Sequence, residues 1–355
     1  MTSDEDDFSD NEHFRETRSS SENAHDTTAS GLSVSGKLRR QFALSLFLQN
    51  PKDNAVCSPV SALMPLGKLV LGAEGATSKE LLAAIGVNKI SEAKKHFKTL
   101  ISELRLISGV TLNICSGIYL NKEHKLMSKF EKDAKSTFGT DVEKVDFNDP
   151  KRAVKKINAW VYKHTNHKIK NILKPTDVSP STSVVLVNGI YFSIVAIPYK
   201  DNNKVSFVVV LPKSKTPSSL TLLLKELKRA PDMLKNAMNE MKYQSLTLSI
   251  PKFKIETKFD LNVQYRNIGL NSMFHEGIKK MVEGRELFVS KAVQSAMIEV
   301  NERGTMAAAA SAVDVNFLNA VISKKEVTAD HPFLFTLVAK NQQLFTGIFT
   351  GSRHH

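Results

Sequence analysis

Apolar residues recur at helical spacing in four segments of the chain, residues 35–49, 58–73, 91–105 and 150–165. In the third segment, Phe97, Leu100, Ile101 and Leu104 fall on one face and lysines fall on the opposite face. That arrangement is typical of a helix packed on a core. The second segment opens with Ser58 and then a proline, a pair typical of a helix N-terminus. The pattern predicts four helices, each with one buried face.

Short runs rich in β-branched and aromatic residues, bounded by Gly, Pro or Asn, predict strands. They lie at residues 111–120, 184–192, 205–211, 245–251, 334–340 and 343–349. The last two runs are separated by a short polar turn, which predicts an antiparallel hairpin. Because helical and strand patterns are mixed and no internal repeat is present, we expect a single α+β domain over residues 36–355.

The first 35 residues lack this patterning. Residues 1–30 contain nine Asp or Glu, two Lys or Arg, and few large apolar side chains, a composition typical of disorder. We therefore expect a disordered, acidic, Ser-rich tail over residues 1–35. Since the whole chain carries +13 and residues 1–30 carry −7, residues 31–355 carry +20. A folded body with that charge attracts polyanions.

No apolar leader and no Asn-x-Ser/Thr acceptor occur in the sequence, so we expect a cytoplasmic protein. We also expect a monomer without a membrane span. Cys57 and Cys115 both lie in apolar segments. Buried, reduced thiols are therefore expected rather than a disulfide.

Signatures of catalysis fail one by one. Residues 31–38, GLSVSGKL, have the glycine spacing of a phosphate loop, but Leu38 replaces the Ser or Thr that binds magnesium. His275-Glu276 lacks the second histidine of a helical zinc site, and the sequence contains no Gly-x-Ser-x-Gly or Cys-x-x-Cys. We expect no enzyme activity, no cofactor and no metal site.

Residues 304–313, GTMAAAASAV, have two interpretations. Four alanines favour a helical turn. However, alternate positions from Thr305 to Val315 are uniformly small or apolar while the other face becomes polar, which favours a half-buried strand. Gly304 adds the backbone freedom of a hinge.

Several stretches together resemble the serpin family of serine protease inhibitors, most closely its intracellular ovalbumin-like branch. They are VSKAVQSAMIEVNERGTMAAAASA, ADHPFLFTLVAKNQQLFTGIFTG, NAVCSPVSALMPLGKLVLGAEGAT, DFNDPKRAVKKINAWVYKHTNHKIKNIL and VLVNGIYF. The resemblance runs from Lys37 to Ser352. It implies a large main β-sheet, helices over it and an exposed reactive loop.

The resemblance also implies a mechanism, in which a protease cleaves the loop, forms an acyl-enzyme, and is carried along as the freed loop enters the main sheet. It implies a hinge at Glu302, Arg303, Gly304, Thr305, Ala307, Ala308, Ala309 and Ala310, and a reactive bond at Leu318-Asn319, with Phe317-Leu318 as the alternative. A leucine before the cleaved bond suits chymotrypsin-like, cathepsin-like or elastase-like targets. Beneath the sheet, the implied shutter residues are Ser58, Ser61, Asn188 and Gln294.

Three features depart from the family pattern. Gln294 replaces the usual shutter histidine, so the polar network must be paired differently. Pro65 falls inside the second helix, where a proline kinks the chain. At the joint between Ser193 and Ile194 several dozen residues usual in the family are missing, including a tryptophan and strands of the second and third sheets. We expect this apparent deletion to weaken inhibition.

A second interpretation is a non-inhibitory or inactive serpin isoform that binds a glycosaminoglycan or another polyanion through its basic face. The candidate residues are Lys94, Lys95, Lys98 and Arg105. A solvated helix face is the simpler explanation of these four cations.

Overall fold

The computed structural model describes residues 41–107, 110–140, 142–194, 205–216, 218–241, 246–301, 325–339 and 342–351. The expected tail, residues 1–35, lies outside these ranges. In the described part, no helix is both long and apolar enough to cross a membrane.

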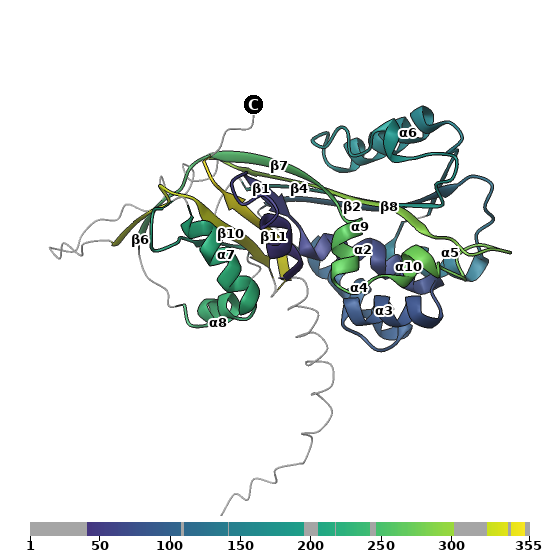
Figure 1. Ribbon diagram of the computed structural model, residues 1–355, viewed down its shortest axis with the longest axis horizontal. Coiled ribbons are helices and arrows are strands. Elements are labelled where there is room, and N and C mark those ends of the chain that lie inside the picture. Colours follow the sequence, from purple (N-terminus) through teal and green to yellow (C-terminus); the bar gives the residue numbers. More distant parts are fainter. Residues whose placement is uncertain are drawn as a thin grey trace, which may run out of the picture.

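A five-stranded sheet of order β3-β2-β4-β8-β7 runs along the molecule (Figure 1). The strands β2 and β4 are antiparallel, β4 and β8 are parallel, and β8 and β7 are antiparallel. The short β3 joins β2 in parallel at the edge. The bounds are β2 Val110–Asn121, β3 Glu143–Val145, β4 Val184–Ile194, β7 Phe253–Asp260 and β8 Val289–Val300.

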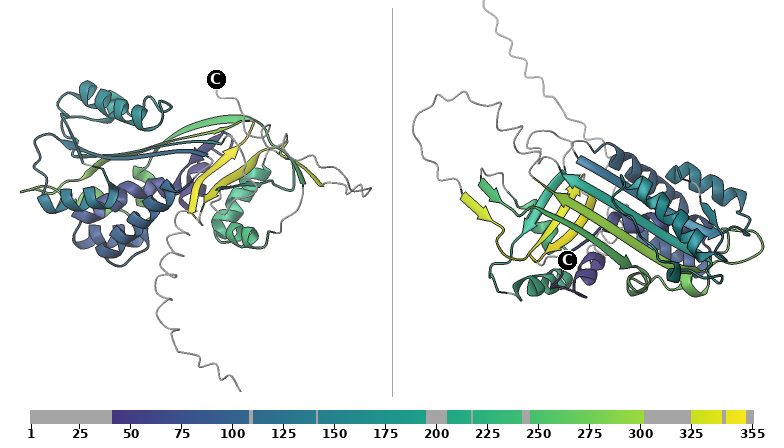
Figure 2. Two further views of the ribbon diagram at one scale, coloured as in Figure 1. Left: turned by 180° about the vertical axis from the view of Figure 1, so that it is seen from behind. Right: turned by 90° about the horizontal axis from the view of Figure 1, so that it is seen from above.

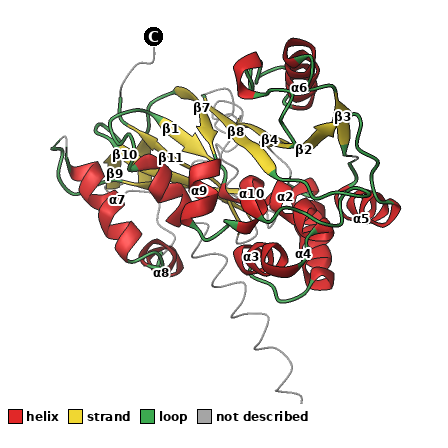
Figure 3. Ribbon diagram, turned by 45° about the vertical axis from the view of Figure 1, so that its right-hand side comes forward, coloured by secondary structure: helices red, strands yellow, loops and turns green. Residues whose placement is uncertain are grey.

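Helices cover both faces of this main sheet. On one face lies α6 (Pro150–His164), and α2 (Pro59–Leu69), α3 (Gly75–Ile85), α4 (Ile90–Arg105) and α5 (Ser128–Phe138) gather on the other (Figures 1 and 3). Because β4 is buried on both faces, its alternate residues enter two separate cores. Val185 and Val187 pack under α6, while Leu186 and Ile190 face the larger core.

A second sheet of order β1-β11-β10-β5 packs against the larger core. Here β10 and β11 form the predicted antiparallel hairpin, and β1 and β5 are the two edge strands among the described residues. Phe207 on β5 stacks on Phe335 with ring centroids 5.5 Å apart. A third sheet among the described residues is the parallel pair of β6 and β9. The bounds are β1 Ala55–Cys57, β5 Val205–Val210, β6 Leu246–Ser249, β9 Lys325–Thr328, β10 Phe333–Ala339 and β11 Gln342–Phe349.

The remaining helices are shorter or peripheral. Residues 41–47 are helical, and the others are α7 Ser219–Arg229, α8 Met233–Asn239, α9 Asn262–Asn267 and α10 Ser272–His275, with 3₁₀ turns η1 Val70–Gly72 and η2 Pro175–Asp177.

The helix α2 begins as its sequence predicts. The Ser58 side chain caps it by accepting from the Ser61 amide, and Pro59 occupies the first turn. The chain stays helical through Pro65. Cys57 and Cys115 are buried free thiols, as expected from their apolar surroundings.

Candidate functional site: the seam between β4 and β8

The strands β4 and β8 lie parallel in the middle of the main sheet, paired up to Ile194 opposite Val300 (Figure 2). We call this junction the seam. After β8 the chain passes Asn301, and description resumes at β9. The expected hinge, residues 302–310, and the expected reactive bond at Leu318-Asn319 lie outside the described residues. Of the regions expected to take part in inhibition, the structure therefore describes the seam.

The four expected shutter residues meet at the middle of the seam. Asn188 and Gln294 are register partners on β4 and β8, and both are fully buried. The Gln294 Oε1 accepts from the Ser58 amide at 3.0 Å, and its Nε2 lies 3.0 Å from Ser58 O and 3.1 Å from Asn188 Oδ1. The Ser61 hydroxyl donates to Asn188 Oδ1 at 2.7 Å. Gln294 thus supplies both a donor and an acceptor to the N-terminus of α2.

Pro65 explains one further bond of this cluster. A proline within a helix cannot donate to the carbonyl four residues earlier, which here belongs to Ser61. The side-chain amide of Asn188 donates to that carbonyl at 2.7 Å. The strand therefore satisfies a helix acceptor that Pro65 leaves open, and α2 is tied to the seam.

Glycine at position 189 lets α6 approach the seam closely. A Cβ placed there would lie 2.7 Å from Cys115 Sγ, 3.1 Å from Val161 Cγ1 and 3.2 Å from Thr165 Cγ2. Since the first distance is far inside normal contact, any larger residue would push β2 or α6 away.

A second polar group closes the seam nearer its end, on the face that α6 covers. Tyr191 on β4 donates to Glu299 Oε2 on β8 at 3.0 Å. Lys168, from the loop after α6, lies 3.3 Å from the same oxygen and 5.2 Å from the Tyr191 ring centroid. We call these three residues the latch, because they join the two strands to the covering loop.

The hydrogen bonds of the latch shift the pKa values of Glu299 and Lys168. Partial burial alone would raise the pKa of Glu299, but hydrogen bonds from Tyr191 and Lys168 hold that pKa below its usual value. The hydrogen bond to Glu299 raises the pKa of Lys168 above its usual value. Both groups are therefore charged near neutral pH.

The expected polyanion residues lie on α4 but are not equivalent. Lys94 forms an ion pair with Asp133 of α5 at 2.7 Å, so part of its charge is already balanced. Lys95, Lys98 and Arg105 are exposed.

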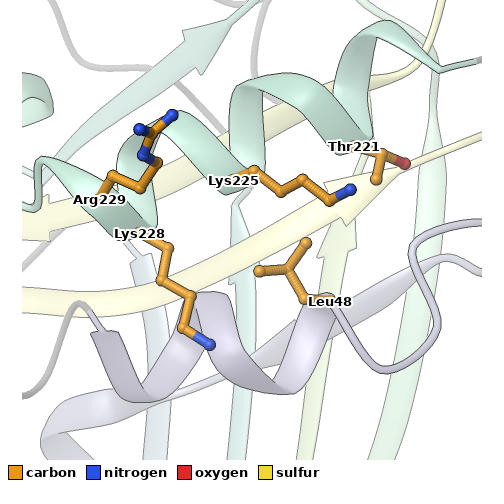
Figure 4. A pocket seen from close by; sticks show the side chains of 5 residues that line it. All are labelled: Leu48, Thr221, Lys225, Lys228 and Arg229. Carbon is orange, nitrogen blue, oxygen red and sulfur yellow. The ribbon is translucent and has the colours of Figure 1, made fainter.

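A separate basic groove was not predicted from the sequence. Lys225, Lys228 and Arg229 of α7 line an open pocket of about 800 Å³ together with Leu48 and Thr221 (Figure 4). Lys228 points from α7 toward the segment that carries Leu48. The sequence feature that could have indicated this groove is the spacing of Lys225, Lys228 and Arg229 at the end of an amphipathic helix.

The sequence matches the family model described as Serpin (serine protease inhibitor) in two segments, residues 37–194 and 192–351. Among curated relatives, antichymotrypsin-2 of Bombyx mori is 34% identical, covering 84% of this chain and 92% of that protein. Antitrypsin of Bombyx mori is 32% identical, covering 84% and 88%.

Solved structures share the fold. Native protease nexin-1 with heparin superimposes with a TM-score of 0.76 at 23% identity, covering 90% of this chain and 99% of that one. Serpin48 of the insect Tenebrio molitor superimposes with a TM-score of 0.75 at 23% identity, covering 93% of this chain and 100% of that one. With two relatives above 30% identity and family-model matches spanning residues 37–351, this chain belongs to the serpin family.

Proposed function

We propose that this chain inhibits serine proteases by loop cleavage and strand insertion. The protease serine attacks the Leu318 carbonyl, the bond to Asn319 breaks, and an ester joins Leu318 to the enzyme. The segment from Thr305 onward then enters the seam and carries the attached protease with it.

The parallel pairing of β4 and β8 is the observation that carries this proposal. A segment that leaves the end of β8 and folds back between them runs antiparallel to both. Antiparallel pairs are slightly more stable per residue than parallel pairs, and the sheet gains a whole strand. On the order of ten added hydrogen bonds at about 1 kcal/mol each would rival the usual stability of a domain, about 5–15 kcal/mol. Insertion is therefore strongly downhill.

The target class follows from the residues before the reactive bond. Phe317 and Leu318 are large and apolar, which suits a chymotrypsin-like, cathepsin-like or elastase-like primary pocket. The relative at 34% identity bears the name antichymotrypsin-2. We therefore place chymotrypsin-like enzymes first.

Denaturing gel electrophoresis after mixing with chymotrypsin tests the proposal. We expect a covalent complex that survives denaturation, and mass spectrometry placing the cut within one residue of Leu318-Asn319. A Leu318→Gly variant is the matched control and should lose the complex with chymotrypsin. Fragments without complex, or a sole loop cut upstream of Val315, would overturn the proposal.

A second candidate function is polyanion binding, favoured by the +20 charge of residues 31–355 and by two exposed sets of cations on α4 and α7. Protease nexin-1, which shares this fold, was crystallised with heparin. Replacing Lys95, Lys98 and Arg105 by alanine should lower the salt at which the protein elutes from heparin. Lys94→Ala should change elution less because of its pair with Asp133, and an unchanged triple variant would exclude the α4 site.

We further propose that the joint at Ser193-Ile194 marks a shortened scaffold. The two family-model segments meet at residues 192–194, where β4 ends. The strand β5, one of the two described edge strands of the second sheet, begins at Val205.

A further inference from the structure

A cavity of about 400 Å³ lies between α2, α4 and β2, outside the seam. Half of its twelve lining residues are apolar, namely Met64, Ile101, Leu104, Leu112, Ile114 and Phe138. Ile101 and Leu104 were expected to be buried with Phe97, which is fully buried, yet both are only half-buried. Both pack against the larger core and also line the cavity, so an apolar occupant would add dispersion contacts on their open side.

Lys68 is the only charged residue of α2 and is 2% exposed, yet it lines this cavity. Its ammonium donates to Ser116 O at 2.6 Å and Thr140 Oγ1 at 2.7 Å. Both acceptors are neutral, and an ammonium has three donors. Among the described residues, no carboxylate lies within ion-pair distance of Lys68. Burying a charge with only neutral partners is costly, and a carboxylate partner would offset that cost.

In the described part of the chain, a hydroxyl without a partner lies beside Lys68. Ser116 is one of the residues that line the cavity, and its buried Oγ has no hydrogen-bond partner among the described residues. Such groups in folded proteins normally find a partner. An incoming acceptor would satisfy this hydroxyl and the Lys68 ammonium together. At the rim, the exposed Arg105 and His164 add further positive or polar character.

We propose that this cavity binds a small amphiphilic carboxylate, with its carboxylate on Lys68 and Ser116 and its apolar body against α4 and β2. The volume falls at the lower end of the range for small-ligand sites, which suits a medium-chain fatty acid or an aromatic acid. The site is independent of the loop and of protease inhibition.

Calorimetric titration of the full chain with octanoate at pH 7, beside 1-octanol as a probe of equal length without charge, tests the proposal. We expect octanoate to bind more tightly than octanol. Lys68→Met should weaken octanoate at least tenfold and leave octanol unchanged, because methionine keeps the apolar bulk. Lys95→Met, on the exposed face of α4, is the matched control and should alter neither affinity.

Proton linkage gives a second readout that does not depend on substituting Lys68. Burial lowers the pKa of Lys68 to about 8, so octanoate affinity should fall several-fold between pH 7 and pH 9.5 while octanol affinity stays constant. The other ionisable side chains that line the cavity are Arg105 of α4 and His164 of α6. The Cys115 thiol of β2 lies in the core under α6 and interacts electrostatically with Lys68. Guanidinium groups in general stay protonated over this pH range, burial raises the pKa of the Cys115 thiol to about 12, and a His164→Gln background removes the imidazole.

Leu112→Trp should fill the cavity and abolish both probes. No binding of octanoate to the wild-type chain, equal affinity for octanoate and octanol, or octanoate binding that neither pH nor Lys68→Met alters would overturn the proposal. In those cases Lys68 would be only a structural tie between α2, β2 and Thr140.

Discussion

Tyr191 donates a hydrogen bond to Glu299 across the seam at 3.0 Å, so a bond joins the two strands that must separate. Tyr191 is opposite Met297, which places Glu299 at the diagonal position two residues further along β8. The latch therefore resists opening at the seam end where the loop leaves β8. Insertion cannot begin there until this bond breaks.

Tyr191→Phe should accelerate insertion. Losing a bond of about 1–2 kcal/mol changes an equilibrium or a rate by about 5- to 30-fold. The measurement is the rate at which a synthetic peptide of residues 305–316 anneals to the uncleaved protein. Tyr119→Phe is the matched control, because the buried Tyr119 hydroxyl has no partner among the described residues. Equal annealing rates for the two variants would show that the latch does not restrain the seam.

Acid should weaken the latch. Because the pKa of Glu299 is lowered in the folded state, its contribution to stability is present above the ordinary glutamate pKa and is lost as pH falls through the folded value. The free energy of unfolding of the wild type should exceed that of Glu299→Gln at pH 7, and this difference should shrink toward pH 3. Urea titrations at both pH values measure it. A difference that persists undiminished at pH 3 would rule out the carboxylate as its source.

Asn188 and Pro65 should be energetically coupled. Asn188→Ala leaves the Ser61 carbonyl buried without its donor, at a cost of about 1–3 kcal/mol. In a Pro65→Ala background, the new backbone amide can donate to Ser61, so Asn188→Ala should cost about 1 kcal/mol less. A double-mutant cycle from urea unfolding gives the coupling. Pro59→Ala, in the first turn of α2, is the control and should show none. Additive effects for Asn188 and Pro65 would refute the compensation.

Thr305→Arg should convert an inhibitor into a substrate. Thr305 is expected to enter the seam first and to face inward, where an unpaired charge is strongly unfavourable. Chymotrypsin should then give cleaved fragments and little covalent complex on a denaturing gel. Met306→Arg, on the alternate face, is the comparison variant and should retain more complex. Undiminished complex formation by Thr305→Arg would argue against insertion of this segment.

Restoring the missing segment at Ser193-Ile194 tests the shortened scaffold. The hinge is identical in both forms, so any difference in how much cleavage raises the melting temperature comes from the sheets. After cleavage at Leu318, we expect the melting temperature of the restored form to rise far more than that of the present chain. An equally large, cooperative rise in the present chain would mean that the joint does not impair inhibition.

Local patterns predicted the elements whose two faces differ. The helices α4 and α6 expose lysines on one side, and the hairpin of β10 and β11 has clear turn residues, so periodicity located them closely. The strand β8 is buried on both faces and shows no alternation. Only the family resemblance indicated it, because a uniformly buried run looks the same in a strand or a buried helix.

For the candidate site, the sequence indicated some residues but not their contacts. The resemblance named Ser58, Ser61, Asn188 and Gln294, but their pairing joins residues 106 to 236 positions apart. No local spacing encodes such contacts. Nothing in the sequence indicated the latch, since Tyr191, Glu299 and Lys168 each resemble ordinary surface or strand residues until the fold brings them together.

On the proposed mechanism, one inserted strand fills the seam between β4 and β8 permanently. The molecule then behaves as a reagent rather than a catalyst: each copy removes one protease molecule and is used up. The amount of protease inactivated would then scale with the number of inhibitor molecules present when the protease appears. The rate at which the inhibitor is synthesised, more than its affinity for the protease, would set that amount.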